Sequence, residues 1–108
     1  MPDGSLPPGT LVMLVLRVLQ AGPLHGYAIA QRLHQLSSDV LQIEEGSLYP
    51  ALQRTLLKGW ARAEWVTSDT NRRVRVYRLT PAGRRQLDAE IADYERTAAA
   101  IRTVLRTA

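Results

Sequence analysis

The chain contains no cysteine. Without thiols it can form neither a disulfide framework nor a thiolate zinc site, and no cysteine nucleophile is available for catalysis. This absence is compatible with a reducing compartment. We therefore expect a cytoplasmic protein.

Long apolar runs are also missing. The longest, LVMLVL at 11–16, is closed by Arg17, whereas a helix that spans a bilayer needs roughly 20 apolar residues. The N-terminal stretch 1–8 carries the acidic Asp3 and has neither a basic segment nor a small-residue cleavage site. We therefore expect neither a membrane span nor a signal peptide.

Acidic residues are scarce in the middle of the chain. Between Arg54 and Arg85, nine basic residues stand against Glu64 and Asp69, a local net charge of +7. The other 76 residues carry five basic and eight acidic side chains, and the whole chain has a net charge of +4. Such a concentration of positive charge predicts a surface that faces a polyanion.

The sequence lacks the residue motifs on which most enzymes depend. There is no paired acid and base, no phosphate-cradling glycine loop and no nucleophile elbow around Ser47. His25 and His34 are nine residues apart and lack the spacing of a metal motif. We expect no enzymatic activity, no cofactor and no metal site.

What is present is enough for one domain, since the chain has 108 residues and 45% of them are hydrophobic. Thr10, Ser47 and Thr80 are typical helix caps, and Pro81 suits a first helical position. Together with the glycines they predict helices over 11–20, 27–36 and 48–58, strands over 61–66 and 74–79, and a last helix from 81. This order predicts a mainly α (α+β) fold, the winged helix-turn-helix with a two-stranded wing.

The apolar side chains suggest how these elements pack. The first helix is apolar almost all round, which a small domain cannot easily bury alone, so we expect part of it, including Leu14, to pack on another subunit. Trp60 and Trp65 are expected to fill the core. The second helix carries one apolar stripe: Ile29, Leu33 and Leu36.

The third helix has two distinct faces. Leu48, Leu52 and Leu56 recur every four residues and are expected to face inward, with Ala51 beside them. The side chains that point away are polar: Tyr49, Gln53 and Arg54. A polar outer face on a short helix favours a binding role.

The second strand is rich in arginine. Tyr77 and Leu79 share a face that is expected to pack inward, and alternation then points Arg78 outward. Arg73 and Arg75 have the inward parity but lie towards the hairpin tip, beyond a small core.

The last helix carries a heptad seam. Its apolar residues recur at steps of 4, 3, 4, 3 and 4: Leu87, Ile91, Tyr94, Ala98, Ile101 and Leu105. The helix would be roughly 40 Å long, longer than such a domain is wide, so it favours a dimer. We expect a winged helix-turn-helix domain over 1–79, with its wing at about 61–79, and a dimerisation helix over 80–108.

Several segments in a fixed order resemble one family. They are GPLHGYAIAQRL (22–33), EEGSLYPALQR (44–54), KGWARAEW (58–65), NRRVRVYRLTPAGRRQL (71–87) and AIRTVLRT (100–107). Together they are similar to PadR-family transcriptional regulators of the short-tailed type, with one C-terminal helix. The resemblance covers nearly the whole chain after about Leu6.

The resemblance implies a homodimeric DNA-binding repressor whose third helix enters the major groove of double-stranded DNA. It assigns DNA contacts to Ser47, Tyr49, Gln53, Arg54, Asn71, Arg72 and Arg73, to which the charge pattern adds Arg75. The family also responds to small molecules, often aromatic or drug-like, in or near the dimer interface, although this property varies between members. The operator would be pseudo-palindromic, with half-sites roughly 34 Å apart.

One position departs from the family pattern. Where relatives typically have Leu-Glu, this chain has Thr55 and Leu56, so the apolar position is displaced by one residue. This leaves open whether Arg54 or Leu57 faces the groove.

A different reading is a winged-helix interaction module whose basic surface holds an acidic protein partner. A protein-docking face on the third helix should be apolar, whereas the outward residues here are polar. The sequence therefore favours DNA.

Overall fold

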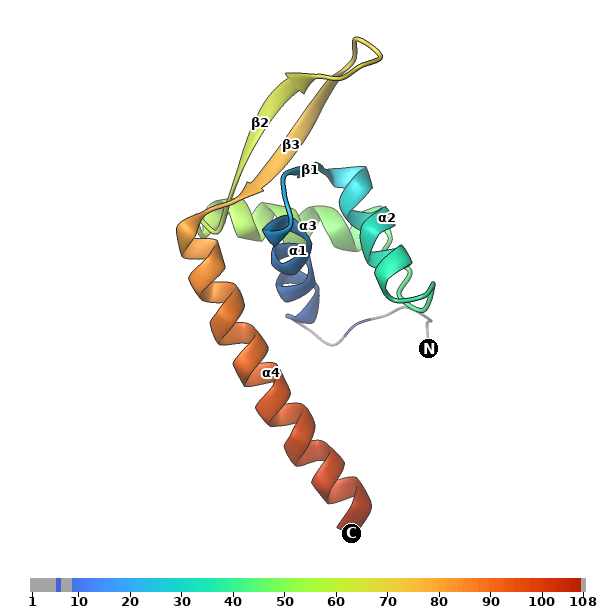
Figure 1. The fold of residues 1–108 in the computed structure, drawn as a ribbon, viewed down its shortest axis with the longest axis vertical. Coiled ribbons are helices and arrows are strands. Elements are labelled where there is room, and N and C mark those ends of the chain that lie inside the picture. The colour runs from blue at the N-terminus through green and yellow to red at the C-terminus, as the bar shows by residue number, and fades with distance from the viewer. Residues whose placement is uncertain (1–5, 7–8, 108) are drawn as a thin grey trace.

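The chain folds into four helices and a small antiparallel sheet over the residues that the computed structural model describes, which are residue 6 and residues 9–107 (Figure 1). The elements are α1 (Thr10–Gln20), β1 (Leu24–His25), α2 (Gly26–Leu36), α3 (Glu45–Leu57), β2 (Ala61–Thr67), β3 (Arg73–Leu79) and α4 (Pro81–Thr107). Residues 1–5, 7–8 and 108 lie outside the described residues. The expected start of the DNA-binding domain, at residue 1, and the expected end of the dimerisation helix, at residue 108, therefore fall outside them too.

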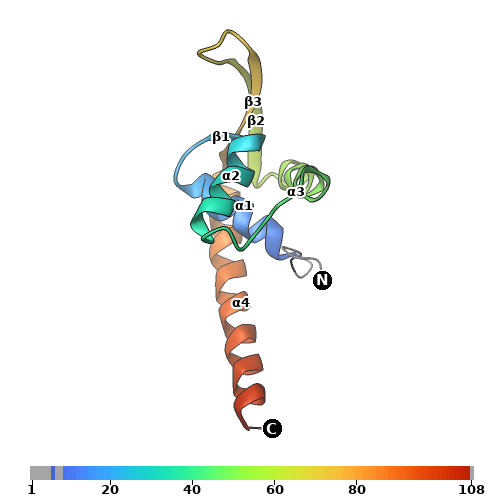
Figure 2. The ribbon, with the colours of Figure 1, turned by 90° about the vertical axis from the view of Figure 1, so that its right-hand side faces the viewer.

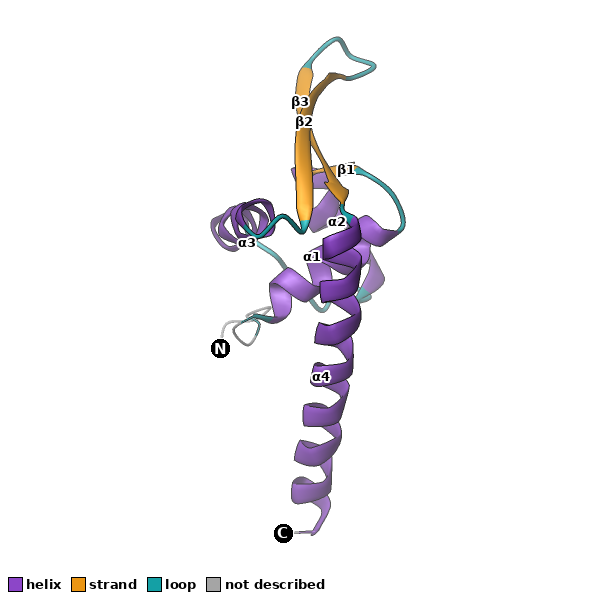
Figure 3. Ribbon diagram, turned by 90° about the vertical axis from the view of Figure 1, so that its left-hand side faces the viewer, coloured by secondary structure: helices purple, strands orange, loops and turns teal. Residues whose placement is uncertain are grey.

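The sheet has the strand order β1-β3-β2. β2 and β3 form the expected hairpin, in register from Ala61 opposite Leu79 to Thr67 opposite Arg73. The sequence did not predict β1, which is two residues long and pairs with the base of β3 through Tyr77 and Val76. The hairpin therefore belongs to a three-stranded sheet, and its far half projects from the helical body (Figure 3).

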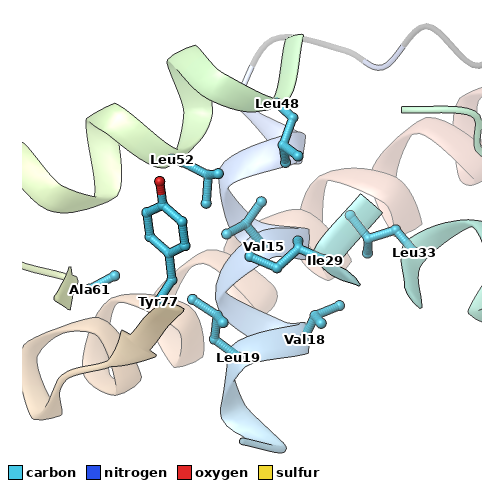
Figure 4. Packing of buried hydrophobic residues seen from close by; sticks show 9 residues of the cluster. All are labelled: Val15, Val18, Leu19, Ile29, Leu33, Leu48, Leu52, Ala61 and Tyr77. Atoms are coloured by element: carbon cyan, nitrogen blue, oxygen red, sulfur yellow. The ribbon is translucent and has the colours of Figure 1, made fainter. Parts of the chain in front are cut away.

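Helix α1 runs through the centre of the body and is buried by the chain itself. One hydrophobic cluster joins it to α2, α3 and the sheet (Figure 4): Val15, Val18, Leu19, Ile29, Leu33, Leu48, Leu52, Ala61 and Tyr77. A second cluster joins its other side to α3 and α4: Val12, Met13, Leu16, Ala51 and Leu87. The chain itself therefore covers most of α1, contrary to the expectation that a small domain cannot easily bury it alone. Leu14 lies half-buried against the first cluster, and its contact with another subunit stays a prediction.

Helix α2 follows its predicted stripe in part. Ile29 and Leu33 are buried, but Leu36, the last residue of α2, is 60% exposed. Ser38 and Asp39 have positive φ angles of 53° and 68°, so the chain turns away directly after the helix. The third position of the stripe therefore falls outside the core.

Helix α3 begins three residues earlier than predicted. Its N-cap is Glu44, so Ser47 lies in the first turn and is not the cap, and Pro50 falls inside the helix. Acidic side chains are favourable at a helix N-terminus, which explains a start at the Glu44-Glu45 pair. The helix ends before Gly59, whose φ of 73° turns the chain towards β2.

Helix α4 starts as predicted, at a cap formed by Thr80. The Gly83 N–H donates a hydrogen bond to Thr80 Oγ1 (3.0 Å), and that hydroxyl donates to the Gly59 carbonyl (2.7 Å). Leu87 is fully buried, whereas Leu105 is 76% exposed. The heptad seam therefore begins in the core and continues along a helix that leaves the body (Figures 1 and 3).

Gly83 sets how closely α4 approaches the rest of the domain. A Cβ atom at this position would lie 2.0 Å from the Trp60 carbonyl oxygen and 2.8 Å from a side-chain carbon of Leu79. The carbonyl belongs to the backbone and cannot rotate away as a side chain could. Only a glycine fits here without moving α4.

We predict that Gly83→Ala lowers the free energy of unfolding by about 1–3 kcal/mol, because overpacking displaces α4 from the core. Thermal and urea denaturation followed by circular dichroism would measure the change.

Gly46→Ala is the matched control, since Gly46 is also helical but has no atom within 4 Å of the added Cβ. This variant should be neutral or more stable by about 0.5–1 kcal/mol. Equal stability of the two variants would contradict the steric role of Gly83.

Candidate nucleic-acid interface

Helix α3 lies at the edge of the body, with one side on the core and the other exposed (Figure 2). Leu48, Ala51 and Leu52 face inward as predicted. The four sequence-predicted contact residues on this helix all reach solvent: Ser47, Tyr49, Gln53 and Arg54. The outer face is therefore polar and accessible over most of its length.

Thr55 occupies a core position at the point where this chain has Thr55 and Leu56 in place of Leu-Glu. Its side chain is fully buried, and Oγ1 donates a hydrogen bond of 2.6 Å to the Leu52 carbonyl, so the hydroxyl is satisfied inside the core. Leu56 is half-buried and Leu57 is 78% exposed. Arg54 and Leu57 therefore both face outward.

Leu57 was not among the predicted contacts, but it continues the exposed row of Tyr49 and Gln53 at four-residue spacing. An exposed leucine at the end of a helix is a weak signal in a sequence. Its place on the row is evident once the start of α3 is known.

One face of the hairpin carries a stack of arginine and aromatic side chains. The Arg73 guanidinium lies 5.2 Å from the centre of the Trp65 ring, and that of Arg75 lies 6.0 Å from the same ring and 5.9 Å from the ring of Tyr77. Exposed cation–π contacts of this kind are each worth about 0.5–1 kcal/mol.

The prediction that both tryptophans fill the core is therefore wrong for Trp65. Its side chain is 57% exposed, because it pairs with Arg75 on the part of the hairpin that extends past the buried Tyr77. Trp60 is half-buried and packs against the second cluster. A tryptophan in a short strand is usually read as a core residue, so the sequence alone did not reveal this surface position.

The opposite face of the hairpin is electrostatically neutralised in part. Arg78, whose role the sequence left undecided, forms an ion pair of 2.9 Å with Glu64 on the neighbouring strand. By contrast, Arg72, Arg73 and Arg75 form no ion pair with any acidic side chain in the part of the chain that the structure describes. The opposite face also holds the exposed Arg62, which forms no ion pair among the described residues. The unneutralised charge therefore lies at the tip, on the face with Trp65 and at Arg62 near the base of β2.

The hairpin tip, residues 68–72, is held by its own hydrogen bonds. The Ser68 N–H donates to the Arg72 carbonyl (2.7 Å), and the Arg72 N–H donates to Ser68 Oγ (3.3 Å). Asn71 has a φ of 61°, a left-handed conformation that asparagine tolerates better than most residues. Asn71 therefore has a backbone role as well as its predicted role in DNA contact.

The arginine stack and α3 meet at the start of α2. A Cβ atom on Gly26 would lie 4.0 Å from a ring carbon of Tyr49 on α3 and equally far from a ring carbon of Tyr77 on β3. Since Tyr77 is also the ring next to Arg75, the exposed side of α3 and the charged face of the hairpin are neighbouring parts of one molecule.

Residues 15–89 match the Transcriptional regulator PadR-like family. The chain belongs to this family. The match confirms the resemblance seen in the sequence, and the PadR-like proteins are transcriptional regulators rather than enzymes. Regulation of transcription through DNA binding agrees with the structure, in which the polar face of α3 lies beside the basic hairpin of β2 and β3.

Solved structures confirm the winged-helix architecture of this PadR-like chain. A PadR family regulator from Eggerthella lenta is 32% identical, with a TM-score of 0.80, and the match covers 93% of this chain and 85% of that one. A transcriptional regulator from Clostridium thermocellum is 25% identical, with a TM-score of 0.81, and the match covers 88% and 92% of the two chains.

A curated relative is much longer. An uncharacterised 37.1 kDa protein in transposon TN4556 of Streptomyces fradiae is 44% identical over 78 residues, which are 72% of this chain and 21% of that protein. The chain thus spans about a fifth of the length of this relative.

Across residue 6 and residues 9–107, none of the helices has both the length and the apolar character that crossing a membrane requires.

We predict that Asn71→Val destabilises the tip of this PadR-like regulator by about 1–2 kcal/mol, because a β-branched residue disfavours the left-handed conformation. The amide proton of Ser68 should then exchange faster with solvent in an NMR experiment. Asn71→Gly is the control, and it should leave the exchange rate close to that of the parent. Fast exchange in the glycine variant alone would contradict the backbone role.

Proposed function

We propose that this chain is a homodimeric, sequence-specific DNA-binding repressor that acts in the cytoplasm, where it meets the chromosome. The supporting observation is the pairing of an exposed polar face on α3 with a group of arginines on the wing that have no acidic partner in the described residues. DNA is the polyanion that this combination fits, because helix α3 can read base edges while the wing binds phosphates.

The outer face of α3 would lie in the major groove. Gln53 can pair with adenine and Arg54 with guanine through two hydrogen bonds each, and Leu57 can contact a thymine methyl group. Ser47 and Tyr49, near the helix N-terminus, carry hydroxyl groups suited to phosphate oxygens. In this arrangement the row Tyr49, Gln53, Leu57 follows the groove.

The wing would contribute sequence-independent affinity. Arg72, Arg73 and Arg75 can each neutralise phosphate charge and release condensed counterions, with Asn71 at the tip beside them. Arg78 already has Glu64 as its partner, so it should contribute less.

Helix α4 would form the dimer, as a dimerisation segment over 80–108 attached to a DNA-binding domain over 1–79. Leu87 and Ile91 pack on the chain's own core, and beyond them Tyr94, Ile101 and Leu105 are exposed. A groove of about 480 Å³ runs beside this seam and is lined by Arg96, Thr97, Ala100, Ile101, Val104 and Leu105. A second copy of α4 would cover these apolar residues, with Ala98 at the close contact and Leu14 of each chain nearby.

The dimer would present two α3 helices to half-sites roughly 34 Å apart on a pseudo-palindromic operator. A dimer bound in this way obstructs transcription, which favours repression. We further propose that an apolar small-molecule effector bound at the dimer interface releases the DNA.

We predict that Arg73→Ala weakens binding to every duplex and flattens the dependence of log K on log salt by about one unit, because one phosphate contact is lost. Fluorescence anisotropy with salt titrations would measure this, using a labelled duplex that the parent enriches from a random-sequence library and one of unrelated sequence. Arg78→Ala is the matched control on the same strand, and it should leave the slope nearly unchanged.

Gln53→Ala should instead change which sequences are preferred. If Arg73→Ala and Gln53→Ala both bound the enriched duplex as the parent does, these faces would not contact DNA. If the parent bound acidic polypeptides but no duplex, the chain would be a protein-interaction module.

We predict that Ile101→Glu shifts the dimer towards monomer at micromolar concentration, because it places a charge in the apolar seam of α4. Light scattering would measure the mass. Ala99→Glu adds the same charge outside both the seam and the groove, and this variant should remain dimeric. Equal masses for both variants would contradict a dimer through this face.

A further inference from the structure

The wing holds an aromatic ring that the core does not need. Trp65 is 57% exposed, and its strand neighbours towards the base, Ala63 and Ala61, supply the contacts to the core from β2. Its ring instead lies within 5.2 Å of the Arg73 guanidinium carbon and 6.0 Å of that of Arg75. The ring is therefore shared by two cations.

This arrangement solves a problem that paired arginines create. Arg73 and Arg75 are two residues apart on one face of β3, where their like charges repel and their long side chains have many rotamers. The face of an indole ring is electron-rich and attracts a guanidinium on its plane. A ring within cation–π distance of both cations therefore restrains both of them and offsets their repulsion.

A cation–π contact also leaves the hydrogen-bond donors of the guanidinium available. The indole ring offers no oxygen acceptor and no negative charge, so the five N–H groups of each arginine keep their capacity to bind an anion. Arg78 is restrained differently, because one of its N–H groups donates to Glu64 and its charge is neutralised. Arg78 and the pair Arg73 and Arg75 are thus restrained in two ways, and only the cation–π contact leaves the arginine charge without an acidic partner.

We propose that Trp65 is a positioning residue that holds Arg73 and Arg75 as a preset pair for adjacent phosphates of the DNA backbone. The inference rests on the proposed function, since it names what orients the wing cations in that complex. A restrained pair loses less side-chain freedom when it binds, so the ring raises affinity without adding charge.

The test compares Trp65→Phe with Trp65→Leu, which keep similar apolar bulk but differ in having an aromatic face. Binding of the enriched duplex and of the unrelated duplex is measured by anisotropy over a range of salt concentrations. Trp65→Leu should weaken binding to both duplexes by about threefold to tenfold, and Trp65→Phe should retain most of the affinity. The salt slope should match that of the parent in both variants, because no charge is removed.

Three outcomes would overturn the proposal. These are equal affinity of Trp65→Leu and the parent, equal loss in Trp65→Leu and Trp65→Phe, and a slope in Trp65→Leu as flat as that of Arg73→Ala. Thermal denaturation checks that each variant is folded. Trp65→Ala is measured beside Trp65→Leu, because it removes the aromatic face without introducing a branched side chain.

The failure of this proposal is distinguishable from that of the proposed function. If the parent discriminates the enriched duplex and Gln53→Ala changes its preference, the chain reads DNA, whatever Trp65 does. If the parent binds no duplex, the DNA-binding function is wrong, and the role of Trp65 is wrong with it.

Discussion

The burial of α1 is the constraint on which the rest of the structure depends. This helix is apolar on nearly every side, so it must be surrounded, and α2, α3, the sheet and the first turns of α4 each cover part of it. Because α3 uses its leucines for this purpose, its opposite side is left for polar residues. Because β3 contributes Tyr77, the more distant half of the hairpin has no core to pack on. The exposed polar face of α3 and the exposed half of the hairpin are thus a geometric result of how one apolar helix is enclosed.

Much of this architecture could be predicted from the sequence. Cap and turn residues located the helices, and the pairing of Thr80 with Pro81 located the start of α4. The periodicity of α3 identified its inward and outward sides correctly. These features depend on local chemistry, which a single sequence carries. The burial of α1 was misjudged because its cover comes from α2, α3, the sheet and α4, and such long-range packing has no local signal.

The candidate site was predictable in its members more than in their arrangement. The arginines of the wing were evident from charge, but the sequence could not say that Arg78 pairs with Glu64 while Arg73 and Arg75 stack on Trp65. Those pairings depend on strand register, in which a shift of one residue reverses the face of every side chain. Ser47 was taken for a cap because it is a good one, but Glu44 and Glu45 start the helix earlier.

The join between β3 and α4 has a mechanical meaning. A single residue, Thr80, separates the strand from the helix, and it is bonded to Gly59, Trp60 and Gly83 at once. There is consequently no flexible linker at which α4 could swing independently of the wing. A change in the orientation of α4 would therefore also reorient the hairpin and the end of α3. Because α4 is long, a small rotation at this join moves its C-terminal end through a large distance.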